Sequence, residues 1–376
     1  MKTLIRNPFV LTPYVPEEYF CDREKETAQL CKHILNGRNV ALFANRRLGK
    51  TGLIRHCFQK KEIKESFHTF LVDIYSAGSL KEMASLFAKA VFSSSGVSGL
   101  RDKLLKGLKS ITPVIGYNEL TSSFSVSAGI RDIPEPERTI EEILSVLDSM
   151  KRPVVIALDE FQRIKDFKEN NTEAYLRTVF QKCENIQFIY TGSIGHSMNN
   201  IFKSPSKPFY NSAVMMTLDV IDRDVYKDFA LRMFRQYGKD IEENLIYKCY
   251  DYFSGVTWYN QLLMNEAFSQ TEKGDKIKEK DFESIYDAII AQQAFSYQEL
   301  FSRFSEKQKA LLFAIAHEGK EGSEITSKEF MNKYGIGPAS SIQTACSALK
   351  KNGFISDNGN RKVITDLIFR DWIRNN

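Results

Sequence analysis

A strand, a short polar loop and a helix follow one another between Val40 and Ile54, and this order constrains the chain more than any other feature. The apolar run Val40 to Ala44 is typical of a strand buried on both faces of a parallel sheet. The loop ends in Gly49-Lys50-Thr51, and a helical pattern follows. In a phosphate-binding loop, backbone N–H groups surround the phosphates, the lysine reaches the β- and γ-phosphates, and the threonine hydroxyl binds Mg²⁺. We therefore expect a nucleotide site here.

One position of this loop departs from the usual pattern. Ala44 stands five residues before Gly49, where such loops carry glycine. Alanine fits there if its φ angle is negative, so the motif is weakened but still possible. Because a Gly-Lys-Thr tripeptide also arises by chance, an ordinary loop at a helix start is the alternative until a second element is found.

The second element is a pair of carboxylates further along the chain. Pro153 to Leu158 is typical of another parallel strand, and Asp159 and Glu160 follow it. In phosphate-loop enzymes the first carboxylate holds Mg²⁺, directly or through water, and the second deprotonates the attacking water. A strand that merely ends in solvated acids is the alternative, which the loop at Lys50 makes the less favoured of the two.

A hydroxyl follows a further predicted strand, Ile186 to Tyr190. Thr191 would lie beside the nucleotide and sense the γ-phosphate through water, or it would only belong to a turn. Ligands bind at the carboxyl ends of parallel strands, so Ala44, Asp159 and Thr191 are expected at one edge of the sheet. The residues expected to bind nucleotide are Asn45, Arg46, Arg47, Leu48, Gly49, Lys50, Thr51, Gly52 and Thr191. Those expected to be catalytic are Lys50 and Glu160, and those expected to bind Mg²⁺ are Thr51 and Asp159.

Composition indicates a cytoplasmic globular protein of two or three domains. The chain has 376 residues, of which 43% are hydrophobic and 26% charged. It has no apolar run near the roughly 18 residues of a membrane span, and no signal peptide is evident. The six cysteines are scattered without metal spacing, which predicts reduced thiols. A net charge of +5 is compatible with nucleic-acid binding without demonstrating it.

The order of the predicted elements divides the chain into three domains. Residues 1–219 form an α/β core with five predicted strands, the others at 68–74 and 214–218, and an irregular insertion at about 93–138. Residues 220–300 are helical and are predicted to form a lid. Residues 301–376 contain three helices and two strands around an Asn-Gly turn, an order typical of a winged helix. Capping boxes are expected to begin two of its helices, at Ser305 and at Thr326.

Aromatic residues precede the first predicted helix, which follows Asp22. They would either line an adenine pocket or pack in the core under the entry loop, and the sequence leaves both readings open. These residues are Phe9, Tyr14, Tyr19 and Phe20.

With these residues in view, the chain resembles a family of P-loop ATPases described mainly from archaea and also widespread in bacteria, within the STAND branch of the AAA+-like proteins. Four segments carry the resemblance: Phe20 to Glu24; Asn45 to Thr51, similar to Gly-Pro-Arg-Arg-x-Gly-Lys-Thr/Ser; Leu158 to Gln162; and Thr191 to Ser193. The resemblance implies a five-stranded parallel sheet with helices on both faces, a helical lid and a C-terminal winged helix. It also implies ATP and Mg²⁺ as ligands.

Two departures from this family concern chemistry. Ala44 and Asn45 replace its Gly-Pro, and Phe209 to Ser212 stands where relatives carry an aromatic residue, glycine and arginine. Because of the second departure, no arginine of this chain is assigned to contact the γ-phosphate. Hydrolysis is therefore expected to be slow or to need a partner's arginine. Arg46 and Arg47 are candidates for contacts between subunits or domains, with solvated loop charges as the alternative.

The interpretation of the sequence is a Mg²⁺-dependent ATPase that works as a switch, with ATP and ADP stabilising different lid and winged-helix positions for a protein partner or a second copy to detect. The alternative is a DNA-associated regulator in which hydrolysis is secondary. A structural module with a decayed site is disfavoured by the intact Lys50, Thr51, Asp159 and Glu160. DNA is not the favoured ligand of the winged helix, which is expected to pack against the ATPase core. Its exposed face offers few cations among Gln343, Thr344, Ser347, Lys350, Lys351, Arg361 and Lys362.

Overall fold

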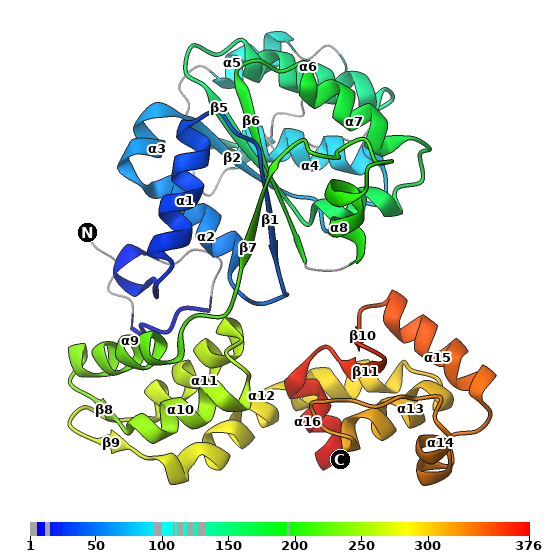
Figure 1. Ribbon diagram of the computed structural model, residues 1–376. Coiled ribbons are helices and arrows are strands. Elements are labelled where there is room, and N and C mark those ends of the chain that lie inside the picture. Colours follow the sequence, from blue (N-terminus) through cyan, green and yellow to red (C-terminus); the bar gives the residue numbers. More distant parts are fainter. Residues whose placement is uncertain are drawn as a thin grey trace. The chain divides into compact units, whose positions relative to one another are not determined.

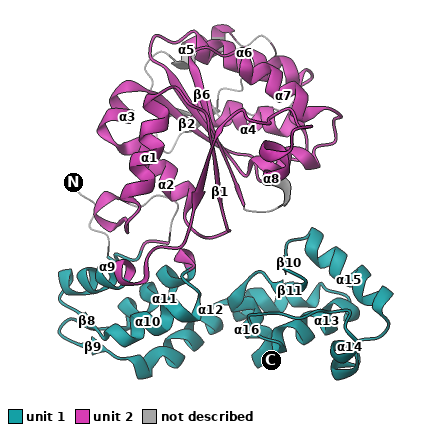
Figure 2. Cartoon of the chain, in the orientation of Figure 1, with its two compact units in different colours: residues 1–9, 227–255, 259–376 teal, residues 10–226, 256–258 magenta. Residues whose placement is uncertain are grey.

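The computed structural model divides into two compact units, which we describe separately (Figures 1 and 2). The sheet unit contains residues 10–226 and 256–258, and the helical unit contains residues 1–9, 227–255 and 259–376. The structure describes residues 6–11, 16–93, 100–107, 110, 116–118, 123–125, 133–193 and 196–376.

The sheet unit is built on five parallel strands in the order β2-β5-β6-β1-β7 (Figure 1). Because all five run in one direction, their carboxyl ends share one edge, and Ala44 at the end of β1 lies in register with Ser193 of β6 and Leu218 of β7. The parallel sheet predicted from the sequence is confirmed. Its strands are β1 (Val40–Ala44), β2 (His68–Asp73), β5 (Val154–Asp159), β6 (Ile186–Ser193) and β7 (Val214–Leu218).

Helices cover both faces of this sheet, as predicted. Every residue of β1 is buried: Val40, Leu42 and Ala44 pack in one apolar cluster, and Ala41 and Phe43 in another. The first cluster contains residues of α1 (Glu24–Leu35), α2 (Lys50–Gln59) and α3 (Lys61–Ser66). The second contains residues of α4 (Leu80–Phe92), α6 (Pro136–Asp148), α7 (Thr172–Gln181) and α8 (His196–Lys203).

The predicted irregular insertion, 93–138, lies partly outside the described residues. Its described part contains α5 (Leu100–Gly107), the antiparallel strands β3 (Gly116–Asn118) and β4 (Ser123–Ser125), and the start of α6. The sequence did not predict α5. Two short 3-10 helices, η1 (Glu17–Tyr19) and η2 (Phe161–Asp166), complete the unit.

The first part of the helical unit is the predicted lid. Phe9 is fully buried there against three rings, those of Phe229, Phe234 and Phe268, so this aromatic belongs to a core. The domain boundary predicted at 300 falls within the last turn of α12. The elements are α9 (Arg223–Gln236), β8 (Asp240–Ile241), α10 (Glu243–Tyr252), α11 (Thr257–Gln270), β9 (Lys276–Ile277), η3 (Glu279–Asp281) and α12 (Phe282–Ser302).

The second part is a winged helix, as predicted. Ser305 forms the expected capping box, but the next helix is capped by Ser327 rather than Thr326, because it is the Ser327 hydroxyl that accepts the Phe330 N–H. Gly359, at φ 59°, forms the turn of the wing. The elements are α13 (Glu306–His317), α14 (Lys328–Tyr334), α15 (Ala339–Lys351), β10 (Ile355–Asn358), β11 (Arg361–Ile364) and α16 (Leu367–Asn375).

Helix α16, which the sequence did not predict, joins the winged helix to the lid helices within the helical unit. Asp371 is 5% exposed, and its carboxylate accepts hydrogen bonds from Tyr252 of α10 (2.7 Å) and Tyr286 of α12 (2.6 Å). Arg370 pairs with the same carboxylate. Burial and the charge of Asp371 raise the pKa of Tyr252 to about 12, so its hydroxyl keeps the proton that it donates. The predicted packing of the winged helix on the ATPase core stays a prediction.

Within the described residues, no helix is both long and apolar enough to cross a membrane.

Candidate nucleotide-binding site

The phosphate loop follows Ala44, whose backbone does not need the positive φ angle that glycine allows. Positive φ angles occur in this loop at Arg47 (68°) and Gly49 (91°), and Ala44 is not among the described residues with positive φ. Ala44 is instead the last paired residue of β1, where alanine is unstrained. Gly49 takes the left-handed conformation directly before α2, so the glycine that the backbone requires is the one that the sequence keeps.

Lys50 is the buried cation of this loop. Its side chain is 7% exposed, and its ammonium group donates to the carbonyls of Ala44 (3.3 Å) and Asn45 (3.4 Å). Burial lowers the pKa of Lys50, while the nearby charges of Glu160 and Asp159 oppose that shift. An ammonium held by two neutral carbonyls in a buried position is well placed to exchange them for phosphate oxygens.

Asp159 brings together three of the predicted residues. One carboxylate oxygen accepts the Thr51 hydroxyl (2.5 Å), and the other accepts the Thr191 hydroxyl and the Glu160 N–H (3.0 Å). Asp159 is 6% exposed and Thr191 fully buried, so these contacts are shielded from water. A carboxylate beside a hydroxyl is a donor set that suits Mg²⁺, which takes its remaining ligands from phosphates and water. In the described part of the chain, no three His, Cys, Asp or Glu side chains gather as a metal site of their own.

Glu160 directly precedes η2, in a conformation that its neighbours maintain. Its φ angle is 57°, in the left-handed region that costs a residue with a side chain some energy. The Gln162 amide donates to the Glu160 carboxylate and lies against Gly192. A Cβ atom at Gly192 would lie 2.2 Å from the Gln162 side-chain oxygen and 2.7 Å from Met198, so any larger residue would displace Gln162. Gln162 and Gly192 therefore position Glu160, and the sequence pattern had not assigned them a role.

Comparison with known families agrees with this arrangement. Residues 20–263 match the model of an ATPase domain predominantly from Archaea, and residues 295–375 match a probable winged helix domain. The first match covers more than half of the chain. The chain belongs to this archaeal-type ATPase family. Nucleotide binding and ATPase activity in general follow from membership, and Mg²⁺ is the usual companion ion.

Solved structures share the fold of this ATPase along nearly its whole length. A Walker-type ATPase of Pyrococcus abyssi is 19% identical with a TM-score of 0.64, and the match covers 98% of this chain and 99% of the other. The Aeropyrum pernix ORC1 protein in complex with DNA and the ORC2 protein with ADPNP and ADP are each 14% identical with a TM-score of 0.59, covering 98% and 96%. At these identities the likeness shows the fold. Among curated proteins, none matches the chain.

The remaining predicted residues of the ATPase loop have different surroundings. Asn45 and Arg46 are exposed, Leu48 is buried, and Gly52 lies against the ring of Phe20. Arg47 is not a solvated loop charge, because its guanidinium carbon lies 4.6 Å from the ring centre of Trp258.

Sequence reasoning missed Arg23. This residue is 4% exposed, and its guanidinium donates to the carbonyl of Asp219 just after β7 (2.6 Å) and pairs with Glu26 (2.7 Å). The same guanidinium lies 3.5 Å from the carbonyl of Leu48. Arg23 thus ties the start of α1 to the phosphate loop and to the end of β7. The segment Phe20 to Glu24 had been noted only for its family resemblance, which was the available signal.

Two of the aromatic residues before α1 are buried, and the predicted adenine pocket stays a prediction. Phe9 is core, and Tyr19 is 7% exposed. Phe20 stacks on His56 of α2, with ring centres 4.0 Å apart, and so lies beside the helix that carries Lys50 and Thr51. Tyr14 lies outside the described residues.

The segment Phe209 to Ser212, where the family resemblance implies an arginine, lies far from the phosphate loop. It precedes β7, whose first residue Val214 pairs with Val40 and whose last residue Leu218 pairs with Ala44. The five residues of β7 span about 16 Å. Ser212 therefore lies at the amino ends of the strands, and Lys50 lies at their carboxyl ends. Asn211, at φ 52°, takes the left-handed conformation, which asparagine tolerates.

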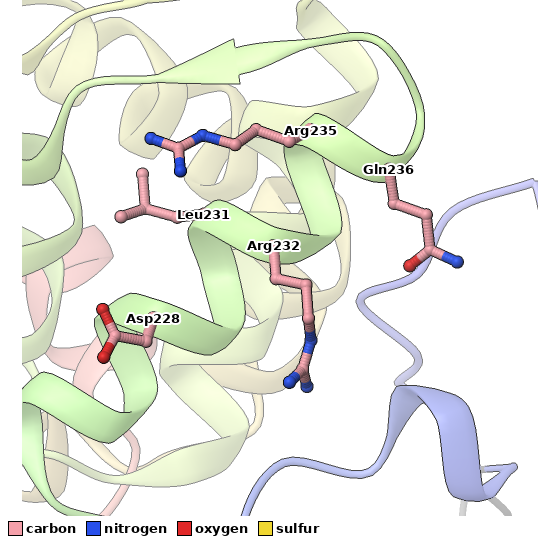
Figure 3. A pocket seen from close by; sticks show the side chains of 5 residues that line it. All are labelled: Asp228, Leu231, Arg232, Arg235 and Gln236. Atoms are coloured by element: carbon pink, nitrogen blue, oxygen red, sulfur yellow. The ribbon is translucent and has the colours of Figure 1, made fainter.

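A separate pocket lies on α9, within the helical unit. It has a volume of about 650 Å³, and Figure 3 shows its two guanidinium groups pointing in different directions, so they do not form one anion site. Its lining comes from a single helix: Asp228, Leu231, Arg232, Arg235 and Gln236.

The contacts of Asp159 lead to a first prediction. Asp159→Asn should weaken Mg·ATP binding at least roughly tenfold, because an amide is a poorer Mg²⁺ ligand and cannot accept both hydroxyls as a carboxylate does. Binding of ATP in EDTA should change much less. Calorimetric titrations with and without Mg²⁺ measure the difference, with Asp166→Asn on exposed η2 as the matched control. Equal losses with and without the metal would contradict a metal role for Asp159.

Proposed function

We propose that the chain is a Mg²⁺-dependent ATPase that acts as a nucleotide-controlled switch through its lid and winged helix. The observation that carries the proposal is the convergence of Lys50, Thr51, Asp159, Glu160 and Thr191 at the carboxyl edge of one parallel sheet. The predicted cytoplasmic location and the STAND assignment rest on the sequence alone.

Each residue has a distinct task in this proposal. Lys50 leaves the carbonyls of Ala44 and Asn45 and neutralises the β- and γ-phosphates. Thr51 and Asp159 hold Mg²⁺, which when bound neutralises charge that develops on the phosphates. Thr191 fixes the Asp159 carboxylate and would contact the γ-phosphate through a water.

Glu160 is the proposed general base. Its carboxylate would take a proton from the water that attacks the γ-phosphorus, and Gln162 holds that carboxylate in position. The bond to the leaving ADP oxygen breaks as the bond to water forms, which yields ADP and inorganic phosphate.

Hydrolysis by the isolated chain is proposed to be slow. Position 212 lies about one strand length from the chain's own phosphate loop, so even an arginine there would serve only another molecule's site. The arginine that speeds such reactions would therefore come from a protein partner or a second copy of the chain.

The simplest test of nucleotide use needs only the purified protein. Denatured protein is expected to release ADP or ATP, seen by anion-exchange chromatography, and nucleotide-free protein should bind Mg·ATP in a calorimeter. A protein that neither carries nor binds nucleotide would overturn the proposed function.

The alternative, a DNA-associated regulator, is supported by a structural neighbour whose solved form contains DNA. The wing of this chain argues against strong DNA binding. Lys350 of α15 and Lys362 of β11 both pair with Asp357 of β10, so that carboxylate already neutralises part of their charge. On the exposed face of α15, the hydroxyls of Thr344 and Ser347 donate to carbonyls of their own helix. This polar, weakly charged face favours a protein partner.

Duplex DNA binding should accordingly be weak, with a Kd above about 1 μM at ~150 mM salt and a steep salt dependence, as for non-specific binding. Fluorescence anisotropy with random and genomic duplexes measures it. Lys350→Glu with Arg361→Glu tests the wing, with exposed Lys280→Glu in the lid as control. Sub-micromolar binding lost only in the wing variant would establish the alternative.

A further inference from the structure

The first turn of α11 is attached to the phosphate loop. The Trp258 N–H donates to the Arg47 carbonyl (3.1 Å), and the Arg47 guanidinium lies over the Trp258 ring at 4.6 Å. Residues 256–258 belong to the sheet unit, whereas the chain on either side of them belongs to the helical unit (Figure 2). One short segment of the lid sequence is therefore part of the body that holds the nucleotide site.

Left-handed backbone conformations occur at Arg47 and shortly before Trp258. Arg47 is left-handed at φ 68°, a conformation that a residue with a side chain keeps only when its surroundings hold it. Ser254 (φ 50°) and Gly255 (φ 73°) are also left-handed and turn the chain sharply just before the attached segment. The contact thus joins a constrained loop residue to the first turn of α11, three residues after a left-handed turn, and both of its residues belong to the sheet unit.

Binding of a phosphate would change the hydrogen bonds of the loop that carries this contact. The Lys50 ammonium now binds the carbonyls of Ala44 and Asn45, which precede Arg47 by three and two residues. When Lys50 turns to the phosphates, those two carbonyls need new donors, which water or a shift of the loop backbone supplies. The Arg47 carbonyl, which holds Trp258, is part of the same short loop.

We propose that Arg47 and Trp258 form a joint between the phosphate loop and helix α11 of the lid. Through this contact, binding of nucleotide at the loop affects the helix. The inference rests on the proposed nucleotide site and adds the residues that couple it to the lid. Arginine suits this joint because its planar guanidinium stacks on an indole, a contact that lysine does not reproduce.

The chain offers a direct probe of the joint, because Trp258 and Trp372 are its two tryptophans. In Trp372→Phe, the fluorescence of Trp258 alone is observed. Titration with Mg·ATP should change its emission, with a midpoint equal to the calorimetric Kd, and Mg·ADP should give a different final intensity. In Arg47→Ala on this background, the emission change should be lost even at nucleotide concentrations at which calorimetry shows the site to be saturated. Arg38→Ala, an exposed arginine just before β1, is the matched control and should keep the change.

Trp372 packs against Tyr297 and Phe369, so its replacement must be shown to fold by circular dichroism. If it does not fold, the difference between the wild-type protein and Trp258→Phe gives the same signal. Nucleotide binding without any change in Trp258 emission would overturn the joint and leave the proposed function intact. An emission change that survives Arg47→Ala would also overturn it. Absence of nucleotide binding by calorimetry would overturn both.

Discussion

Replacement of Lys50 by alanine should weaken Mg·ATP binding by about 3 kcal/mol, or roughly 100-fold in Kd, in the range for losing one partner of a buried charged contact. Lys50 is nearly buried and bound only to neutral carbonyls in the residues that the structure describes, so it can turn to a phosphate at little cost. Without it, phosphate charge would enter the site without its proposed main protein countercharge. Calorimetry with Mg·ATP measures the effect.

Lys60→Ala is the matched control for this change. Lys60 follows α2 at its other end and pairs with exposed Glu17 (2.6 Å), so its loss should leave nucleotide affinity unchanged. Unchanged affinity in Lys50→Ala itself would show that the loop does not bind phosphate.

The Glu160→Gln variant should bind ATP within a few-fold of the wild-type affinity but lose turnover by at least roughly 100-fold, the usual contribution of a general base. Glutamine keeps the shape of the side chain and its place beside Gln162, but it cannot accept a proton from water at neutral pH. Single-turnover release of phosphate at saturating Mg·ATP separates the two effects.

Glu184→Gln, an exposed residue before β6, provides the control for a lost carboxylate. Hydrolysis by Glu160→Gln at the wild-type rate would mean that another group activates the water. A large loss of ATP affinity in this variant would instead indicate that Glu160 has a role in binding.

The sheet and the centre of the site could be predicted because local patterns specify them. An apolar run such as Val40 to Ala44 indicates a strand buried on both faces, and parallel strands bring their carboxyl ends to one edge. This rule alone predicted that Asp159 and Thr191 would lie together, and they share a hydrogen bond.

Contacts between distant segments could not be predicted in this way. Arg23 binds a carbonyl 196 residues away, and Tyr252 binds a carboxylate 119 residues away. Periodicity shows which side of a helix is buried, but it does not show which polar group of another element is the partner. Arg47 is similar, because its own neighbourhood is a loop and its partner Trp258 begins a helix of the lid sequence. The Ser327 cap was misassigned by one residue because Thr326 and Ser327 are both good caps.

The anchoring of α16 has a consequence for deletion experiments. Phe369 and Trp372 of α16 pack on Tyr297 and Phe301 near the end of α12, and Asp371 binds the hydroxyls of Tyr252 and Tyr286. A chain cut between the predicted lid and winged helix would sever the last turn of α12 and leave an aromatic surface open to solvent, which favours aggregation. The phenotype of such a deletion would report damage to the lid as much as loss of a binding module. Point substitutions on the exposed face of α15 avoid this confusion and are the sounder genetic tool.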